Sequence, residues 1–201
     1  GMQSPLTVTQ MLWVNLIMDT FAAMALASLP PSESVMRERP RSRKVFIINR
    51  SMWTSIISTG CIFFFLLLGL LWYLQHTQLT SLTQMWEVPF LPVNKGMSDY
   101  ELSLFFTVFV FLQFWNMFNA RAFATGRSAF HFKGCSGFLT IACAIFFGQI
   151  AIVELGGEFF NVTPLRLTDW VIIVAGTSPV LLIGELIRLL SRPASCASER
   201  E

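Results

Sequence analysis

The sequence contains few charged residues: Asp, Glu, Lys and Arg make up 13% of its 201 residues, whereas an ordinary soluble domain has about 25%. The charges are also clustered, and residues 51–74 contain no charged side chain at all. An apolar run of this length can cross a bilayer core of about 30 Å as a helix. The composition excludes a soluble globular domain, because a chain of this size could not bury several such helices in one core.

Cysteine pairs and catalytic motifs are also missing. The four cysteines show no CxxC spacing, so we expect free thiols rather than disulfides or zinc ligands. There are only two histidines, no glycine-rich phosphate loop and no Ser/His/Asp arrangement. The chain is therefore not expected to carry out soluble-enzyme catalysis, and no nucleic-acid partner is expected.

What the sequence does contain is a series of long apolar segments. They lie at about residues 6–29, 50–75, 102–121, 137–155 and 168–190. We predict an all-α fold, a polytopic membrane helix bundle with five transmembrane helices, in one domain covering residues 1–201. Pro5 is expected at the first helical position, where its missing N–H has no cost.

Basic residues lie mainly on one side of this predicted bundle. The loops and ends that share one face hold 12 of the 14 Lys and Arg residues, and only Lys95 and Arg166 fall on the other face. Cytoplasmic loops of membrane proteins carry an excess of Lys and Arg. We therefore predict that the first helix runs from outside to inside and that the C-terminus is cytosolic.

The first predicted helix carries an acidic residue at membrane depth. A carboxylate at the centre of a membrane helix costs at least about 2.5–3.5 kcal/mol, and Asp19 lies near the centre of this span. Asn15 precedes it by four residues, which places both side chains on one helical face, about one turn apart. Their oxygen atoms suit calcium, magnesium or sodium. The alternative is a polar pair that hydrogen-bonds to neighbouring helices.

Other polar residues within the spans are weaker candidates for an ion-binding role. Gln113, Asn116 and Asn119 recur at every third position of the third span, and they indicate either an ion path or hydrogen bonds between helices. Glu154 is expected to be solvated near the outer surface. Glu185 is expected to pair with Arg188, and most of the aromatic side chains are expected to face lipid.

Several stretches of the chain resemble P-type calcium pumps of the plasma-membrane type. The string Met-Leu-Trp-Val-Asn-Leu-Ile-Met-Asp-Thr at residues 11–20 resembles the sixth transmembrane helix of that family. Residues 109–113 and 118–121 resemble its eighth helix, and residues 149–157 its ninth. Thr163-Pro164-Leu165 before Trp170 is similar to the segment that leads into the tenth.

The resemblance implies the C-terminal membrane half of an ATP-driven calcium efflux pump in a plasma membrane. In that family, residues at the positions of Asn15 and Asp19 bind the transported Ca2+, together with ligands from a fourth helix that is absent here. The partners would be helices one to five, the cytosolic domains of the parent and the lipid bilayer. ATP and Mg2+ would act in the parent only, because the DKTGT and TGES sequences are absent, and the fragment alone is expected to be inactive.

The same resemblance implies three further details. Met18 and Gln113 stand where two-site pumps of the family carry Thr and Glu, so we expect one calcium ion per cycle. The basic loop at 30–49 corresponds to one that docks against the phosphorylation domain, although its composition suits anionic lipid equally well. The short tail after Arg192 leaves no room for a long calmodulin-binding extension and favours a bacterial pump.

Two other functions remain open at this point. One is a P-type pump for another cation, such as manganese, sodium or potassium, since manganese shares the oxygen ligands of calcium. The other is a non-catalytic structural or regulatory bundle in which Asn15 and Asp19 only bind neighbouring helices. A channel is a weaker alternative, because there is one deep acid and no repeated filter sequence.

Overall fold

The computed structural model describes residues 5–29, 50–92, 96–125, 128–130 and 134–191, and of residues 16–18, 50–51, 124–125 and 187–191 it describes the backbone alone. These ranges contain helices and no strand. Five helices among them are long and apolar enough to cross a membrane. The predicted all-α bundle of five spans is thereby confirmed. The basic loop at 30–49 and the tail after Arg192 lie outside the described ranges.

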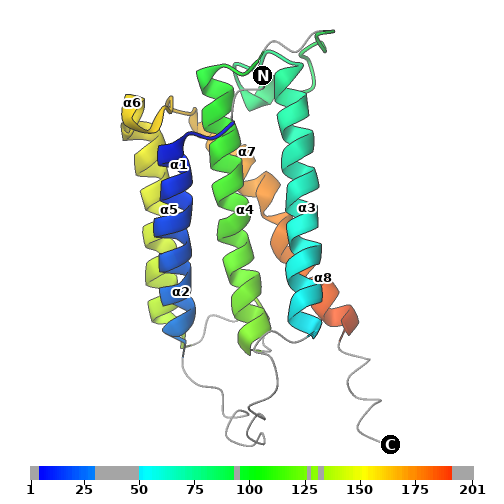
Figure 1. Cartoon of the computed structure of the whole chain (residues 1–201), viewed down its shortest axis with the longest axis vertical. Helices are drawn as coiled ribbons and strands as arrows, with labels where there is room; N and C mark the ends of the chain where they lie inside the picture. Colours follow the sequence, from blue (N-terminus) through cyan, green and yellow to red (C-terminus); the bar gives the residue numbers. More distant parts are fainter. Residues whose placement is uncertain (1–4, 30–49, 93–95, 126–127, 131–133, 192–201) are drawn as a thin grey trace, which may run out of the picture.

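The five spans lie side by side, and spans that follow one another in sequence run in opposite directions (Figure 1). The first span consists of α1 (Val8–Leu12), the π-helix η1 (Trp13–Met18) and α2 (Asp19–Ala27). The middle spans are α3 (Arg50–Gln75), α4 (Asp99–Thr125) and α5 (Ser136–Leu155), and the fifth consists of α7 (Leu167–Thr177) and α8 (Pro179–Ser191). Two short helices, η3 (Leu82–Gln84) and α6 (Gly157–Phe160), lie in the connections at one end.

The first span begins later than expected. Thr7 precedes α1, and its hydroxyl accepts a hydrogen bond from the backbone N–H of Gln10, while the Gln10 side chain accepts one from the Thr7 N–H. This reciprocal arrangement satisfies two of the N–H groups that a helix start leaves unpaired. The expectation that Pro5 occupies the first helical position is therefore wrong, because the capping pair fixes the start at Val8.

The central helix of the bundle is α4, which packs against α3, α5, α7 and α8. Its phenylalanine side chains form most of the aromatic core, with Phe111 and Phe114 in edge contact with each other and with Phe146 of α5. Buried phenylalanines are Phe63, Phe105, Phe106, Phe111, Phe114, Phe118 and Phe138. The expectation of lipid-facing aromatics is thus wrong for α4, because this helix is enclosed by four others.

By contrast, α3 exposes most of its surface. Trp53, Phe64, Phe65 and Trp72 are all more than half exposed. In a bilayer these side chains would contact lipid tails, which are as apolar as the side chains themselves. For this helix the expectation of lipid-facing aromatic residues fits the structure.

The fifth span is broken near its middle, where we expected one helix over 168–190. Pro179 has no N–H, so it cannot donate to the carbonyl of Ala175 four residues earlier. The Ser178 hydroxyl takes over this role and donates to the Ala175 carbonyl oxygen at 2.8 Å. The break therefore leaves no gap in the hydrogen bonding of Ala175, which matters in a membrane because no water is available there.

Two buried carboxylates organise the connection between α3 and α4. Asp169 of α7 is fully buried and accepts hydrogen bonds from Tyr100, Ser81 and the backbone N–H of Leu82, all at 2.9–3.0 Å. Glu101 is also fully buried and accepts from the backbone N–H of Leu79 at 2.9 Å. The two acids tie this connection to the ends of α4 and α7.

Candidate functional site

The candidate ion-binding residues lie on the π-helical part of the first span. The backbone N–H of Asp19 donates to the carbonyl of Val14, five residues earlier rather than four. Asn15 lies inside η1, and Asp19 is the first residue of α2. Single π-helical turns inside longer helices are rare and occur frequently at functional sites. No feature of the sequence predicted this turn.

Both candidate side chains are exposed in the structure. Asp19 lies with Thr20, Ala23, Met24 and Ala27 on one face of α2, where they border a shallow hollow of about 540 Å³ that is open on its outer side. Ala25, on the other side of the same helix, is fully buried. The polar pair therefore faces away from the rest of the described bundle.

The described part of the chain does not complete a metal site by itself. It contains no group of three or more His, Cys, Asp or Glu residues placed to hold a metal ion. Calcium prefers roughly 6–8 oxygen ligands, and Asn15 and Asp19 supply only two side chains. Further oxygen ligands would have to approach the exposed face of the first span from outside the described residues.

The opposite face of the first span is fixed to α5 and α6. The Gln10 amide donates to the backbone carbonyl of Phe160 at 2.9 Å, and the Trp13 indole N–H donates to Gln149 Oε1 at 3.0 Å. Near the other end, a Cβ placed on Gly137 would lie 3.0 Å from the Ser28 hydroxyl oxygen. These contacts orient the helix so that Asn15 and Asp19 point away from α5.

The polar residues of α4 divide into two groups. Asn119 donates to the carbonyl oxygen of Val180 at 2.9 Å, next to the break in the fifth span. For Asn119, the structure therefore shows a hydrogen bond between helices, which was the alternative to a place on an ion path. Gln113 and Asn116 are partly buried, and within the described ranges no hydrogen bond brings either of them to Asn15 or Asp19. Their place on the ion path stays a prediction.

Two acidic residues lie in environments other than those expected. Glu154 is half-buried, and its Oε1 accepts hydrogen bonds from the Trp170 indole N–H at 2.8 Å and from the backbone N–H of Leu165 at 3.3 Å. The expectation of a solvated Glu154 is wrong, because α7 brings these donors to it. Glu185 accepts from the Ser128 hydroxyl and from the backbone N–H of Ala129. The side chain of Arg188, its expected partner, lies outside the described residues.

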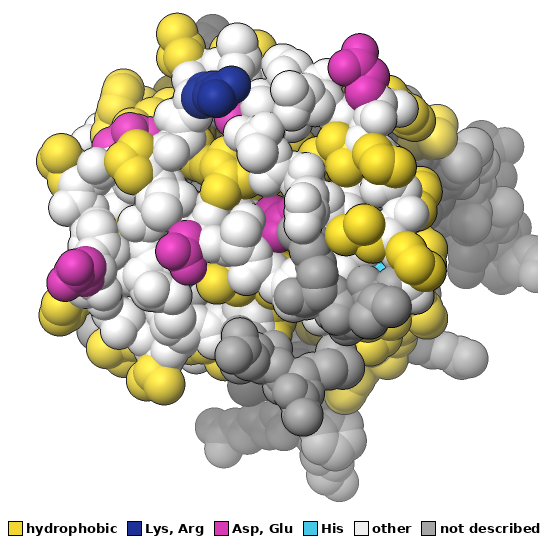
Figure 2. Space-filling model, turned by 90° about the horizontal axis from the view of Figure 1, so that it is seen from above, with side chains coloured by type: hydrophobic (Ala, Val, Ile, Leu, Met, Phe, Trp, Pro, Cys, Tyr) yellow, Lys and Arg dark blue, Asp and Glu magenta, His cyan; other side chains and the backbone are white. Residues whose placement is uncertain are grey.

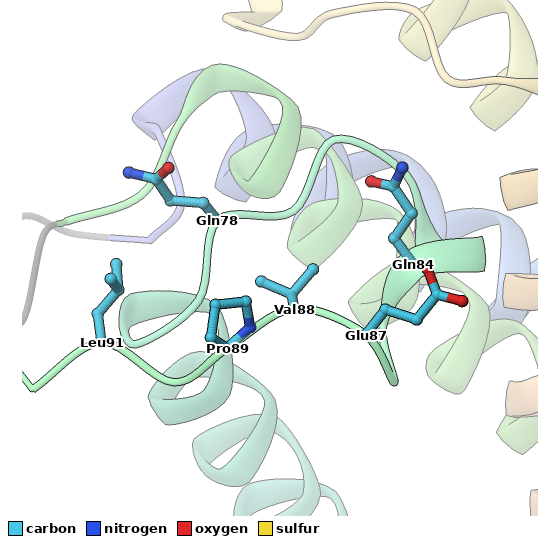
Figure 3. Close-up of a pocket in the computed structure, with 6 residues that line it drawn as sticks. All are labelled: Gln78, Gln84, Glu87, Val88, Pro89 and Leu91. Carbon is cyan, nitrogen blue, oxygen red and sulfur yellow. The ribbon is translucent and has the colours of Figure 1, made fainter.

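A second hollow lies in the connection between α3 and α4 and is separate from the ion-binding candidates. It has a volume of about 320 Å³, and Figure 3 shows its lining side chains: Gln78, Gln84, Glu87, Val88, Pro89 and Leu91. This connection lies at one end of the bundle, whereas the junction of η1 and α2 lies within a span (Figure 1). The hollow offers a single carboxylate and is not a candidate for the transport site.

Among the described residues, the end of the bundle that carries this connection bears acidic side chains at several separate places and basic side chains at one place (Figure 2). Such a distribution agrees with an outward-facing end, because Lys and Arg concentrate on the cytoplasmic side. The orientation of the chain in the membrane nevertheless stays a prediction.

Sequence reasoning assigned no role to two polar residues that the structure makes prominent. Gln149 is buried and bonded to the first span, and Asp169 is buried with three hydrogen-bond donors. For Asp169, a charged residue in the first turn of an apolar span was a usable signal. For Gln149, the sequence alone could not indicate which helix lies opposite.

Comparison with known proteins gives one consistent family. Residues 3–190 match the family described as "Cation transporting ATPase, C-terminus". The chain is 33% identical over 186 residues to calcium-transporting ATPase PAT1 of Dictyostelium discoideum. The matched region covers 92% of this chain and 16% of that protein. The chain is 35% identical over 190 residues to plasma membrane calcium-transporting ATPase 2 of Oreochromis mossambicus, again 92% of this chain and 16% of the relative.

A plant relative gives the same result. Calcium-transporting ATPase 3, plasma membrane-type, of Oryza sativa subsp. japonica is 33% identical over 193 residues, which are 94% of this chain and 17% of that protein. The chain thus spans about a sixth of the length of the curated relatives it matches. Because the match to the family covers nearly the whole chain and all five spans, the chain belongs to the cation-transporting ATPase C-terminal domain family.

Proposed function

We propose that this chain is the membrane-embedded part of an ATP-driven calcium efflux pump, and that Asn15 and Asp19 supply ligands to the transported ion. The observation that carries the proposal is a carboxylate near the middle of the first span, directly after a π-helical turn, with no hydrogen-bond partner in the described part of the chain. Relatives named as calcium-transporting ATPases support calcium as the ion.

The exposed setting of Asp19 supports a partner on this face of the first span. An ionised carboxylate facing lipid at the bilayer centre costs at least about 2.5–3.5 kcal/mol. Protein helices that bring oxygen atoms to the hollow beside Asp19 would remove this cost and would also complete the coordination of calcium. We propose that helices one to five of the parent pump, with its cytosolic domains, are these partners.

In the proposed mechanism, the chain contributes binding rather than catalysis. The Asp19 carboxylate and the Asn15 amide oxygen hold the ion while the site is closed, and both are hard oxygen donors of the kind calcium prefers. ATP with Mg2+ would phosphorylate a cytosolic domain that lies outside this chain. The resulting movement of the membrane helices would expose the site to each side of the membrane in turn.

The relatives named above are eukaryotic and are called plasma-membrane or calcium-transporting proteins. They support residence in a plasma membrane. The bacterial source that the short tail suggested has no support from them and stays a prediction.

The test is calcium-dependent ATPase activity and calcium uptake into vesicles, measured for the full-length pump and for its Asp19→Asn variant at equal expression. Loss of the carboxylate charge should abolish both activities. The matched control is Asp99→Asn, which removes an exposed carboxylate at the start of α4 and should keep both activities. Full calcium transport by Asp19→Asn would show that Asp19 is part of the scaffold and that the proposed site is wrong.

The same measurement decides between the remaining alternatives. A pump for another cation would show ATPase activity stimulated by manganese or sodium rather than calcium, again lost in Asp19→Asn. A structural bundle would show no cation-stimulated activity that depends on Asp19. In that case the substitution should alter assembly alone, because Asp19 would only contact neighbouring helices.

A further inference from the structure

Gln149 is a buried polar residue whose role the proposed ion site leaves unexplained. It lies in α5 with 1% of its surface exposed, and its Oε1 accepts the indole N–H of Trp13 at 3.0 Å. Trp13 is the first residue of the π-helical turn η1 and lies two residues before Asn15. The hydrogen bond thus joins the fourth span directly to the turn that carries the ion-binding candidates.

The indole of Trp13 is held by two further contacts. A Cβ placed on Gly148 would lie 3.3 Å from the Trp13 ring, so the glycine lets the ring lie close against α5. The ring of Phe160 meets that of Trp13 edge to face, with centroids 6.4 Å apart. Together with the hydrogen bond to Gln149, these contacts define one position for the indole.

The π-helical turn lies between two places where the first span is attached to its neighbours. At its start Trp13 bonds to Gln149, and about one turn earlier the Gln10 amide donates to Phe160; beyond α2, Ser28 lies against Gly137 of α5. A π-helical turn is rare inside a longer helix and frequently marks a functional site. We infer that Gln149 is a positioning residue, which acts through Trp13 to hold the π-helical turn and so sets the calcium affinity of the site at Asn15 and Asp19.

Stability alone gives a poor account of a glutamine at position 149. Its Nε2 is buried without a hydrogen-bond partner in the described part of the structure, and an unpaired buried donor is unfavourable. A leucine of similar size would fill the space without that penalty. The amide oxygen is the part of Gln149 that makes a hydrogen bond, and the donor of this bond is the Trp13 indole N–H.

The inference rests on the proposed function, and its test uses the full-length pump. We would measure the half-saturating calcium concentration and the maximal rate of the ATPase for Gln149→Leu, Trp13→Phe and the double variant. Loss of one hydrogen bond should raise the half-saturating concentration about three- to tenfold with little change in maximal rate. The double variant should match the single variants, because all three lack the same bond.

The matched control is Trp115→Phe. The Trp115 indole N–H donates to the Thr177 hydroxyl at 3.0 Å, between α4 and α7, so the same substitution removes an equivalent bond away from the first span. The control should lower the thermal unfolding midpoint without raising the half-saturating calcium concentration.

An unchanged half-saturating concentration in Gln149→Leu would overturn the inference, and so would an equal rise in the control. If Gln149→Leu does not accumulate, Trp13→Phe decides by the same criteria. Asp19→Asn is measured alongside: if it keeps full calcium-stimulated activity, the proposed ion site at Asn15 and Asp19 is wrong. If it is inactive while Gln149→Leu binds calcium normally, only the positioning role is wrong.

Discussion

Asp19 and Asp169 show how differently two acids in apolar segments of one chain can be placed. Asp169 is fully buried and accepts three hydrogen bonds from other segments. Asp19 is exposed, and no hydrogen bond to it occurs in the described ranges. A buried, fully bonded carboxylate stabilises the fold around it. An unpartnered one at membrane depth is by default a functional candidate.

This contrast predicts a structural defect for substitution of Asp169. Asp169→Ala would leave the Tyr100 hydroxyl, the Ser81 hydroxyl and the Leu82 N–H without their acceptor. Tyr100→Phe removes only one of these bonds and should cost about 1.5–3 kcal/mol, as expected for a hydrogen bond to a charged group. The thermal unfolding midpoint of the full-length pump should therefore fall further in Asp169→Ala than in Tyr100→Phe.

The exposed acid Asp99 provides the control for this comparison. Asp99→Asn should leave the unfolding midpoint near that of the unchanged protein, because the side chain is exposed. An unchanged midpoint in Asp169→Ala would contradict a structural role of the buried carboxylate.

At the scale of whole elements, two of the five spans depart from a regular α-helix. The first contains the π-helical turn η1, and the last is divided at Ser178 and Pro179. Each departure has its own means of support within the bundle. The π-helical turn is attached to α5 through Trp13. The break is supported by the Ser178 hydroxyl and by Asn119, which donates to Val180.

The break in the fifth span predicts a specific coupling between two residues. Ser178→Ala should lower the free energy of unfolding by about 0.5–1.5 kcal/mol, because the Ala175 carbonyl then loses its donor. In a Pro179→Ala background the new backbone N–H can bond to that carbonyl, and Ser178→Ala should cost little. The four proteins, unfolded with detergent or urea, form a double-mutant cycle that measures this coupling. Equal effects of Ser178→Ala in both backgrounds would show that the hydroxyl does not replace the missing N–H.

At the scale of the whole molecule, the described bundle is closed around α4 and open at the first span. The helix α4 is enclosed by four others, whereas Asp19 and its neighbours on α2 line an exposed hollow. The chain also spans about a sixth of the length of its curated relatives. The open face is the one that we propose contacts the rest of the pump.

Two residues of the sequence predict how many ions the pump carries. Met18 and Gln113 occupy the positions where the resemblance places the Thr and Glu of a second site, and neither side chain carries a carboxylate. We expect the full-length pump to bind one calcium ion per phosphorylated enzyme. Calcium-45 binding measured against phosphoenzyme content checks this ratio. A ratio of two would mean that other residues form a second site.

The sequence by itself determined the five spans, their alternating direction and the acid near the middle of the first span. Long apolar runs, clustered charges and a single deep carboxylate are local features, and the physics of the bilayer acts on them directly. The family could be recognised for the same reason, since the string around Asn15 and Asp19 is continuous in the chain.

Only the tertiary structure decided what each polar residue faces. The π-helical turn, the bond from Trp13 to Gln149 and the three donors around Asp169 all depend on which helices lie side by side. Hydrophobic patterns are weak guides to this arrangement in a membrane protein, because lipid tails and apolar side chains are similar surroundings for a helix. Packing and hydrogen bonds between distant segments therefore decided which helices lie side by side.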